Sequence, residues 1–224
     1  PWVTTTTPRG TPNLTAIATD TLGQTTVSAP VAITLSNGAP PAAAATFVGT
    51  DTTTSGSWVG TYGTDGFIIA NDTASTPAYY ATVNLNGANT FTYVDPTNYP
   101  EGLLKTRTSP TTDRIVSAYY QLTSAQNNNG VISIDVNLVD FAQHQVALYF
   151  VDWQSSTRNV QVQILDSSTQ AVLDTRTVAS YMLGKYLVWN LTGHVTMKVT
   201  EIINDPASAP NTVTVNGLFF DQSH

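Results

Sequence analysis

Apolar and polar residues alternate with a period of two over much of the chain. The alternation is clearest over residues 131–139 and 160–164, where every second residue is Val, Ile or Leu and the residues between them are polar. Successive side chains of a strand point to opposite faces, so this pattern predicts strands with one buried face. Residues 145–151 are apolar at nearly every position, which predicts a central strand buried on both faces.

Further strand-like segments are separated by short runs of turn residues. We expect strands over residues 115–122, 186–191, 195–202 and 213–220, and no segment shows a helical repeat longer than two turns. Turn signals recur about every ten residues, which is typical of a sandwich or a barrel. The sequence therefore predicts an all-β protein, with a two-sheet jelly-roll-like sandwich over residues 46–224.

Composition limits the partners and the chemistry. The chain has 8 Lys and Arg against 15 Asp and Glu, a formal charge of −7, and no cysteine. This balance offers no electrostatic footprint for nucleic acid or anionic lipid, and no run of 18 apolar residues predicts membrane insertion. The absence of Cys excludes disulfides and a thiol nucleophile. Rich in Thr, Asn and Gly, the composition is typical of a secreted bacterial protein at the cell surface or outside the cell.

A proline- and alanine-rich segment divides the chain. Residues 39–45 read Ala-Pro-Pro-Ala-Ala-Ala-Ala, and consecutive prolines restrict the backbone, so we interpret them as a linker. The 38 residues before it hold two expected strands, over residues 14–19 and 27–35, around an Asp20–Gly23 turn. Their Leu-Thr-Ala-Ile-Ala-Thr-Asp-Thr-Leu-Gly hairpin, followed by Ser-Ala-Pro-Val, resembles the C-terminal half of bacterial Ig-like domains.

A half-domain cannot close a β-sandwich by itself, which implies that residues 1–38 are an incomplete Ig-like unit. We therefore expect the chain to be part of a longer protein and to have neighbouring domains as partners.

The rest of the chain carries a second resemblance. Residues 50–66, 144–153, 172–180 and 186–191 are similar to a module that recurs in large secreted bacterial proteins. The strand layout of residues 46–221 also looks like that of malectin-like and other jelly-roll carbohydrate-binding modules. This similarity implies binding of a polysaccharide or glycan, but it transfers no binding residue position by position.

Catalytic patterns are scarce. The chain has no G-x-S-x-G, P-loop, G-x-G-x-x-G or H-E-x-x-H motif, and its three histidines share no metal-ligand spacing. Glu101 and Glu201 are the only glutamates, and most aspartates lie beside turn residues. A small β-sandwich glycoside hydrolase or polysaccharide lyase would need two placed carboxylates, or a base with an acid partner, that only the fold could bring together.

Aromatic residues beside turns are the sharper candidates for function. Aromatic rings can stack on the apolar faces of sugars, while amide, carboxylate or guanidinium groups bond the hydroxyls. Packing in the core is the competing explanation for each ring. The candidates for carbohydrate binding are Trp58, Tyr62, Tyr79, Tyr80, Tyr120, Trp153 and Arg158.

Two aspartates are candidates for a structural Ca²⁺ site. Asp51 follows the first strand after the linker, and Asp221 ends the last strand, where jelly-roll modules often place a Ca²⁺ held by carboxylates and carbonyls. No D-x-D-x-D-G loop accompanies them.

Three functions follow from these observations. The first is a non-catalytic carbohydrate-binding module of a larger secreted protein. The second is a structural or adhesive module of a cell-surface array, and the third is the small hydrolase or lyase.

Overall fold

The computed structural model describes residues 13–33, 41–105, 113–122, 130–153, 157–202 and 212–223. The chain divides into two compact units, residues 1–40 and 41–224, which we call the head and the body and describe separately. All regular elements within the described residues are strands, as the sequence predicts. None of the described segments is a helix of the length and apolarity that crossing a membrane requires.

The head consists of two antiparallel strand pairs. A turn between β2 and β3 is held by Asp20, whose Oδ1 accepts hydrogen bonds from the backbone N–H of Leu22 and of Gln24 at 2.8 and 2.9 Å. The expected strand over residues 27–35 is wrong as a single element, because Ser28 turns away and its hydroxyl accepts a hydrogen bond from the Ala16 N–H. Its end, Leu35, lies outside the described residues. The strands are β1 (Asn13–Leu14) with β4 (Val31–Ala32), and β2 (Ile17–Thr19) with β3 (Thr25–Val27).

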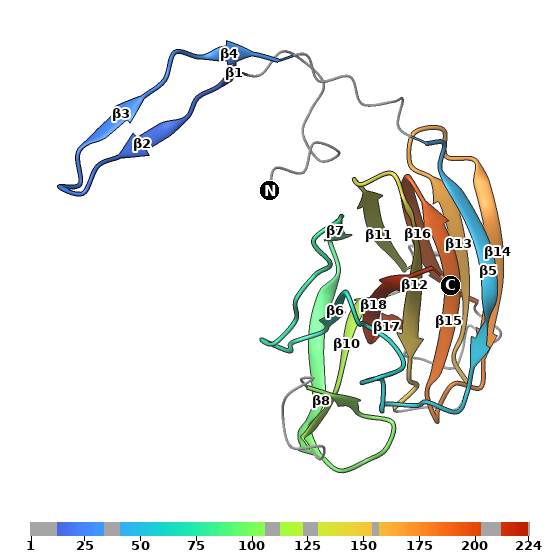
Figure 1. The fold of residues 1–224 in the computed structure, drawn as a ribbon. Coiled ribbons are helices and arrows are strands. Elements are labelled where there is room, and N and C mark those ends of the chain that lie inside the picture. The colour runs from blue at the N-terminus through green and yellow to red at the C-terminus, as the bar shows by residue number, and fades with distance from the viewer. Residues whose placement is uncertain are drawn as a thin grey trace. The chain divides into compact units, whose positions relative to one another are not determined.

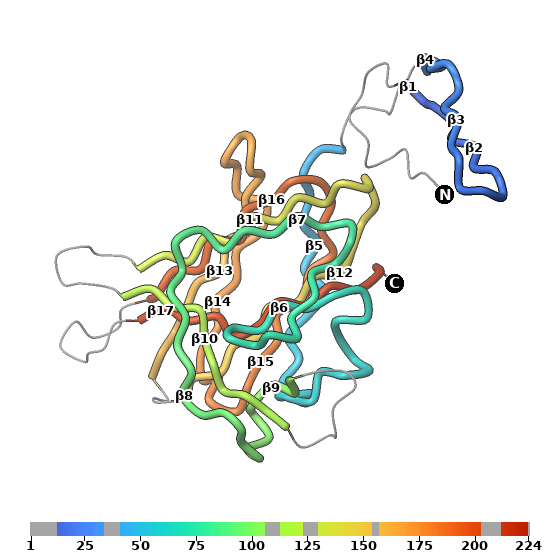
Figure 2. The backbone as a smooth tube through the Cα atoms, turned by 90° about the vertical axis from the view of Figure 1, so that its left-hand side faces the viewer, coloured from blue at the N-terminus to red at the C-terminus, as the bar shows by residue number. Residues whose placement is uncertain are grey.

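The body contains two five-stranded antiparallel sheets and a smaller third sheet (Figures 1 and 2). The central sheet has the order β5 (Ala44–Asp51), β15 (Lys185–Thr192), β12 (Gln143–Phe150), β18 (Gly217–Gln222) and β6 (Gly66–Ile69). The outer sheet has the order β14 (Val172–Ala179), β13 (Asn159–Asp166), β16 (His194–Glu201), β11 (Val131–Leu138) and β7 (Ala81–Asn86). The third sheet joins β17 (Thr212–Val215), β10 (Arg114–Leu122) and β8 (Asn89–Thr97), with β9 (Leu103–Leu104) paired to β10.

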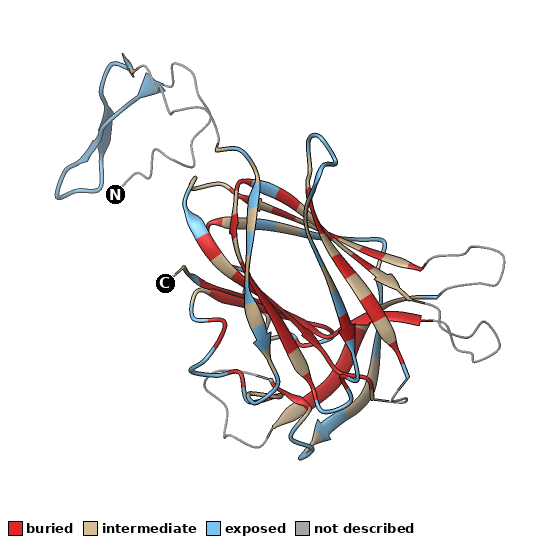
Figure 3. Ribbon diagram, turned by 90° about the vertical axis from the view of Figure 1, so that its right-hand side faces the viewer, coloured by how far each residue is buried: buried red, intermediate tan, exposed pale blue. Residues whose placement is uncertain are grey.

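The main core fills the space between the central and outer sheets. Along β11 the apolar residues point inward and are buried, while the polar residues between them are partly exposed, as the alternation over 131–139 predicts. Figure 3 shows this alternation as red and tan bands along the strands. The predicted β-sandwich class is therefore confirmed.

The central sheet is buried on both faces. Along β12, Val146, Leu148 and Phe150 face the main core, whereas Ala147 and Tyr149 face a second apolar cluster. This second cluster is closed by the segment after β5 and by β9 and β10, so the central sheet has an apolar layer on each side. The unbroken apolar run over 145–151 correctly predicts this position.

Two boundaries differ from the predicted ones. The strand expected over 213–220 is two strands, β17 and β18, in different sheets, and Asn216 stands between them. The Asn216 side chain accepts a hydrogen bond from the Val151 N–H at 2.8 Å and donates one to the Ser117 carbonyl at 2.7 Å. These two hydrogen bonds hold the chain where it passes from one sheet to the other. The expected linker over 39–45 is also shorter, since β5 begins at Ala44 and pairs there with Thr192.

Candidate functional site

Three of the aromatic residues that the sequence suggested for carbohydrate binding lie in the core. Trp58 is 0% exposed, packs against Phe67 and Phe219, and donates its indole N–H to the Leu104 carbonyl at 2.8 Å. Tyr62 is buried and stacks on Tyr186 with 4.4 Å between ring centroids. Neither ring can contact a sugar, because both are buried in the second apolar cluster, on the face of the central sheet that points away from the outer sheet. These two assignments are corrected to core packing.

Tyr80 is the third buried ring. It stacks on His144 with 3.5 Å between centroids and donates its hydroxyl to Asp65 at 2.9 Å. Burial, followed by the hydrogen bond to Asp65, raises the pKa of Tyr80 well above its ordinary value, so the phenol stays a neutral donor. Its neighbour Tyr79 points the other way and is 81% exposed, as strand alternation predicts for an adjacent pair. Tyr79 has an edge contact with Tyr80, with 5.1 Å between the ring centroids.

Asp51 and Asp221 hold one turn of the chain. The Asp221 carboxylate accepts hydrogen bonds from the N–H groups of Gly63 and Thr64 at 2.9 and 2.6 Å. Asp51 accepts hydrogen bonds from Thr53, Thr54 and the Tyr62 hydroxyl. Two strands of the central sheet separate β5 from β18, so the two carboxylates anchor the turn from different strands. No cluster of three or more His, Cys, Asp or Glu side chains that could hold a metal ion occurs within the described residues, and a structural Ca²⁺ at these aspartates stays a prediction.

We expect Asp51→Asn to lower the free energy of unfolding by about 1 kcal/mol at neutral pH. Partial burial raises the pKa of Asp51, but the hydrogen bonds from Thr54 and Thr53 outweigh it and lower that pKa well below its ordinary value. A lowered folded-state pKa stabilises the fold fully above the unfolded-state pKa of about 3.9, and the gain is lost as pH falls through the folded-state pKa. Urea unfolding from neutral to acidic pH should show the two proteins converging; a pH-independent difference would contradict the role of the charge.

Arg158 forms a buried ion pair. Its side chain is 6% exposed and that of Asp152 is 1% exposed; the guanidinium Nη1 donates to the Asp152 carboxylate, and so does the Arg158 backbone N–H at 3.2 Å. The pair fixes the start of β13 against the end of β12. Arg158 is therefore not a sugar contact in this arrangement, and its assignment is corrected to a structural one.

A group of aromatic rings lies around this ion pair. Burial is the main cause that raises the pKa of Tyr93. The charge of Arg158 lowers this pKa, while Asp152 and Tyr120 raise it. Arg158, Asp152 and Tyr120 therefore all lie within electrostatic range of the Tyr93 hydroxyl. Tyr93 contacts the half-exposed Phe91 edge-on at 5.0 Å between centroids. Tyr120, on β10, is half-buried. The structure thus brings the suggested residues Tyr120 and Arg158 to one region.

Trp153 follows Asp152 directly, and its partly buried ring packs against the second apolar cluster. The ring contacts Tyr99 edge-on at 5.0 Å between centroids, and Tyr99 is 54% exposed. We call the end of the body that carries these two rings the loop end. Figure 1 shows β5 and β12 both running toward this lower end of the body, where the segments that follow them lie.

Hydrogen bonds hold the segments of the loop end together. Ser55 donates its hydroxyl to the carbonyls of Pro100 and Leu183, at 3.3 and 2.9 Å, and the Asp152 N–H donates to the Tyr181 carbonyl at 3.2 Å. The chain around Tyr99, the segment after β5 and the β14–β15 connection are therefore neighbours. Ser55 adopts a φ of 49°, an uncommon value for a residue with a side chain.

A pocket of about 460 Å³ lies at the loop end. Its lining residues are Thr52, Ser180, Met182, Leu183, Gly184 and Lys185. Leu183 is 67% exposed, and Ser180 and Gly184 adopt φ values of 52° and 85°. A Cβ at position 184 would lie 2.0 Å from the Tyr149 hydroxyl oxygen, so this close turn requires glycine. The pocket combines apolar walls with hydroxyl groups and one ammonium group, a composition typical of small-molecule sites.

Sequence reasoning placed Trp153 at this site but missed Tyr99, Leu183 and Lys185. Tyr99 stands between Asn98 and Pro100, which is itself a turn signal beside an aromatic ring. For Leu183 and Lys185 the sequence offers only the Gly184 turn, and their proximity to Trp153 depends on contacts between segments far apart in the chain.

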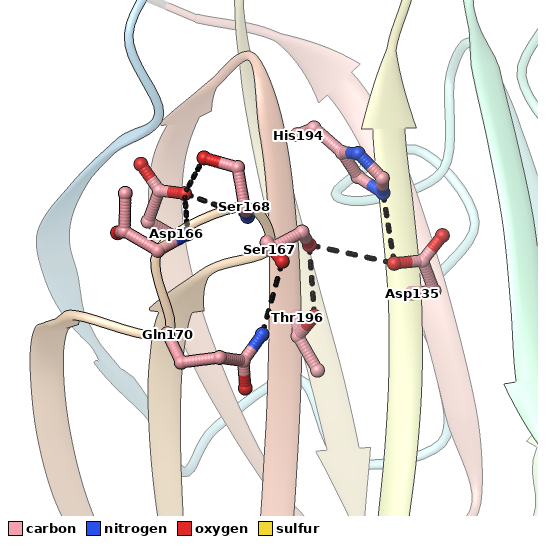
Figure 4. Close-up of polar contacts among 8 residues, drawn as sticks. Asp135, Asp166, Ser167, Ser168, Gln170, His194 and Thr196 are labelled. Carbon is pink, nitrogen blue, oxygen red and sulfur yellow. Dashed lines mark hydrogen bonds and ion pairs between the residues drawn. The ribbon is translucent and has the colours of Figure 1, made fainter.

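A polar cluster on the outer sheet brings a serine, a histidine and an aspartate together (Figure 4). Asp135 lies 2.8 Å from His194 Nε2 and accepts a long hydrogen bond of 3.4 Å from Ser167 Oγ, which also lies 2.8 Å from Thr196 Oγ1. A nucleophilic serine needs the histidine next to its own hydroxyl, whereas here the carboxylate stands between the two. These residues therefore form a surface hydrogen-bond network and not a catalytic triad.

Comparisons with known proteins give structural neighbours only. No family model and no curated protein matches the chain. Among solved structures, the chain resembles the carbohydrate-binding module TmCBM61 in complex with β-1,4-galactotriose, with 10% identity, a TM-score of 0.30, and coverage of 64% of this chain and 86% of that one. It also resembles a carbohydrate-binding module of the β-sandwich superfamily with promiscuous specificity, at 9% identity, a TM-score of 0.25, and coverage of 96% and 73%. At these scores neither neighbour carries an argument about the ligand of this chain.

Proposed function

We propose that the body is a non-catalytic carbohydrate-binding module and that the loop end is its binding site. The observation that carries the proposal is the contact of the exposed Tyr99 with the partly exposed Trp153 at the end of the body that holds the 460 Å³ pocket. Two rings set edge-to-face give a sugar chain an apolar wall, and the hydroxyl groups of Thr52 and Ser180 supply hydrogen bonds from the pocket.

The surroundings of the site support the same function. Tyr93 lies within electrostatic range of the Asp152–Arg158 pair and contacts Phe91 edge-on, so a glycan longer than one residue has further rings to contact. We further propose that the module acts in a secreted or cell-surface protein on a polysaccharide, with neighbouring domains in a longer chain. A low content of charged residues and the absence of cysteine support this context.

We expect Trp153→Ala and Tyr99→Ala each to weaken glycan binding about tenfold or more, because aromatic anchors of an interface commonly contribute over about 1 kcal/mol. The assay is affinity electrophoresis of the 224-residue chain on a panel of neutral and acidic polysaccharides, followed by calorimetry on those that retard it. Tyr79→Ala is the matched control and should bind as the wild type does. Tyr79 is exposed and contacts Tyr80, which stacks on His144 near the start of β12, whereas Trp153 follows the end of that strand.

Two outcomes would overturn the proposal. Retardation by none of the polysaccharides would favour the structural or adhesive role. An equal loss in all three variants would place the binding site elsewhere.

A further inference from the structure

We propose that the pocket at the loop end holds a carboxylate-bearing sugar residue, with Lys185 as its counter-charge. This inference rests on the proposed function and names the class of glycan that the same site would take. Lys185 is the single charged residue among the six that line the pocket, in a chain whose formal charge is −7.

Lys185 has unused hydrogen-bonding capacity. Its Nζ donates to the Ala179 carbonyl at 2.7 Å, and an ammonium group has three donors, so two N–H groups remain. Lys105 and Arg158 are paired with the carboxylates of Asp95 and Asp152. Arg114 donates to the carbonyls of Pro100 and Gly102 and to Ser57 Oγ, and it is not among the residues that line the pocket. Among the described residues, Lys185 has no carboxylate within ion-pair distance.

Asp51, on the strand next to Lys185, does not neutralise the Lys185 ammonium. Asp51 is the Cα partner of Tyr186, and neighbouring strand residues point to opposite faces, so the side chains of Asp51 and Lys185 lie on opposite sides of the central sheet. The Asp51 oxygens are moreover occupied by Thr53, Thr54 and Tyr62 on that other side. The positive charge in the pocket is therefore available to a ligand.

The same charges limit how acidic the ligand can be. An ammonium beside the hydroxyls of Thr52 and Ser180 suits a carboxylate, whose charged hydrogen bonds are stronger than neutral ones. A chain of consecutive uronic acids would meet the repulsion of a protein charged −7, which acts within a screening length of about 8 Å at physiological ionic strength. The pocket thus fits one acidic residue, such as a terminal uronic acid, on an otherwise neutral glycan.

The test compares oligosaccharides that differ only in their terminal residue. On a glycan array, the 224-residue chain should bind a glucuronic-acid-capped oligosaccharide about tenfold more tightly than the same oligosaccharide capped with glucose. Lys185→Gln should abolish this preference, so that the two forms bind with similar affinity. Lys185→Arg, which keeps the charge, should retain the preference. Lys198→Gln, on the outer sheet, makes the same change in net charge away from the pocket and should behave as the wild type.

The possible results separate this inference from the proposed function. Equal binding of both caps by the wild type, or a preference that survives in Lys185→Gln, overturns the inference. If Trp153→Ala still weakens glycan binding in that case, the proposal of carbohydrate binding at the loop end stands, and only the inference about the acidic sugar is lost. Absence of binding to any glycan overturns both. Thermal unfolding of each variant, compared with the wild type, shows whether a lost preference reflects the site or a lost fold.

Discussion

Arg158→Met should lower the free energy of unfolding by about 3–5 kcal/mol, because it leaves the Asp152 carboxylate buried without its cationic partner. Both side chains are nearly inaccessible to solvent, and Asp152 also accepts the Arg158 backbone N–H. Breaking such a pair costs far more than the pair contributes as a whole, since an unpaired buried charge loses its hydration without compensation.

Chemical denaturation of the wild type, Arg158→Met and two further variants measures this effect. The double variant Arg158→Met/Asp152→Leu should recover part of the loss, because it removes the stranded charge as well. Lys105→Met is the control: the Lys105–Asp95 pair is partly exposed, with side-chain exposures of 27% and 32%, so its loss should cost at most about 1 kcal/mol. Equal effects of Arg158→Met and Lys105→Met would mean that burial of the Asp152–Arg158 pair does not determine its energy.

Much of the fold could be predicted because strands have a simple period. The alternation over 131–139 identifies β11 and its inward face, and the continuous apolar run over 145–151 identifies the central position of β12. A period of two says nothing about which strands pair. The third sheet and the change of sheet at Asn216 depend on side-chain hydrogen bonds to residues 65 and 99 positions away in the chain.

The candidate site was harder to predict because an aromatic residue beside a turn has two outcomes. Trp58 and Trp153 both follow polar, turn-rich or strand-end sequence, yet the first is fully buried against the central sheet and the second is partly exposed. The central sheet has two apolar faces, so the segment after β5 must fold back over one of them and bury its rings. The local sequence around Trp58 does not show that this segment has to cover a face of the central sheet. The need to cover that face follows from the tertiary structure, in which β9 and β10 pack on the same face of the central sheet.

Trp58→Ala should accordingly act on stability and not on a ligand, with a loss of about 3–5 kcal/mol in the free energy of unfolding. The variant removes a ring that contacts Phe67 and Phe219 at 4.5 and 5.1 Å between centroids, and it leaves the Leu104 carbonyl without the indole N–H. Trp58→Phe keeps most of the apolar volume and loses the hydrogen bond, so it should cost less.

Denaturant unfolding of the two Trp58 variants beside Tyr79→Ala tests this assignment. The ring of Tyr79 is 81% exposed, and its removal should change the free energy of unfolding by no more than about 0.5 kcal/mol. Folded Trp58→Phe should also keep its glycan affinity, whereas Trp153→Ala should lose affinity with little loss of stability. A Trp58→Ala protein as stable as the wild type would show that this ring does not close the second core. A folded Trp58→Phe protein without glycan affinity would return Trp58 to the binding site, because the aromatic volume would be present and only the indole edge would be missing.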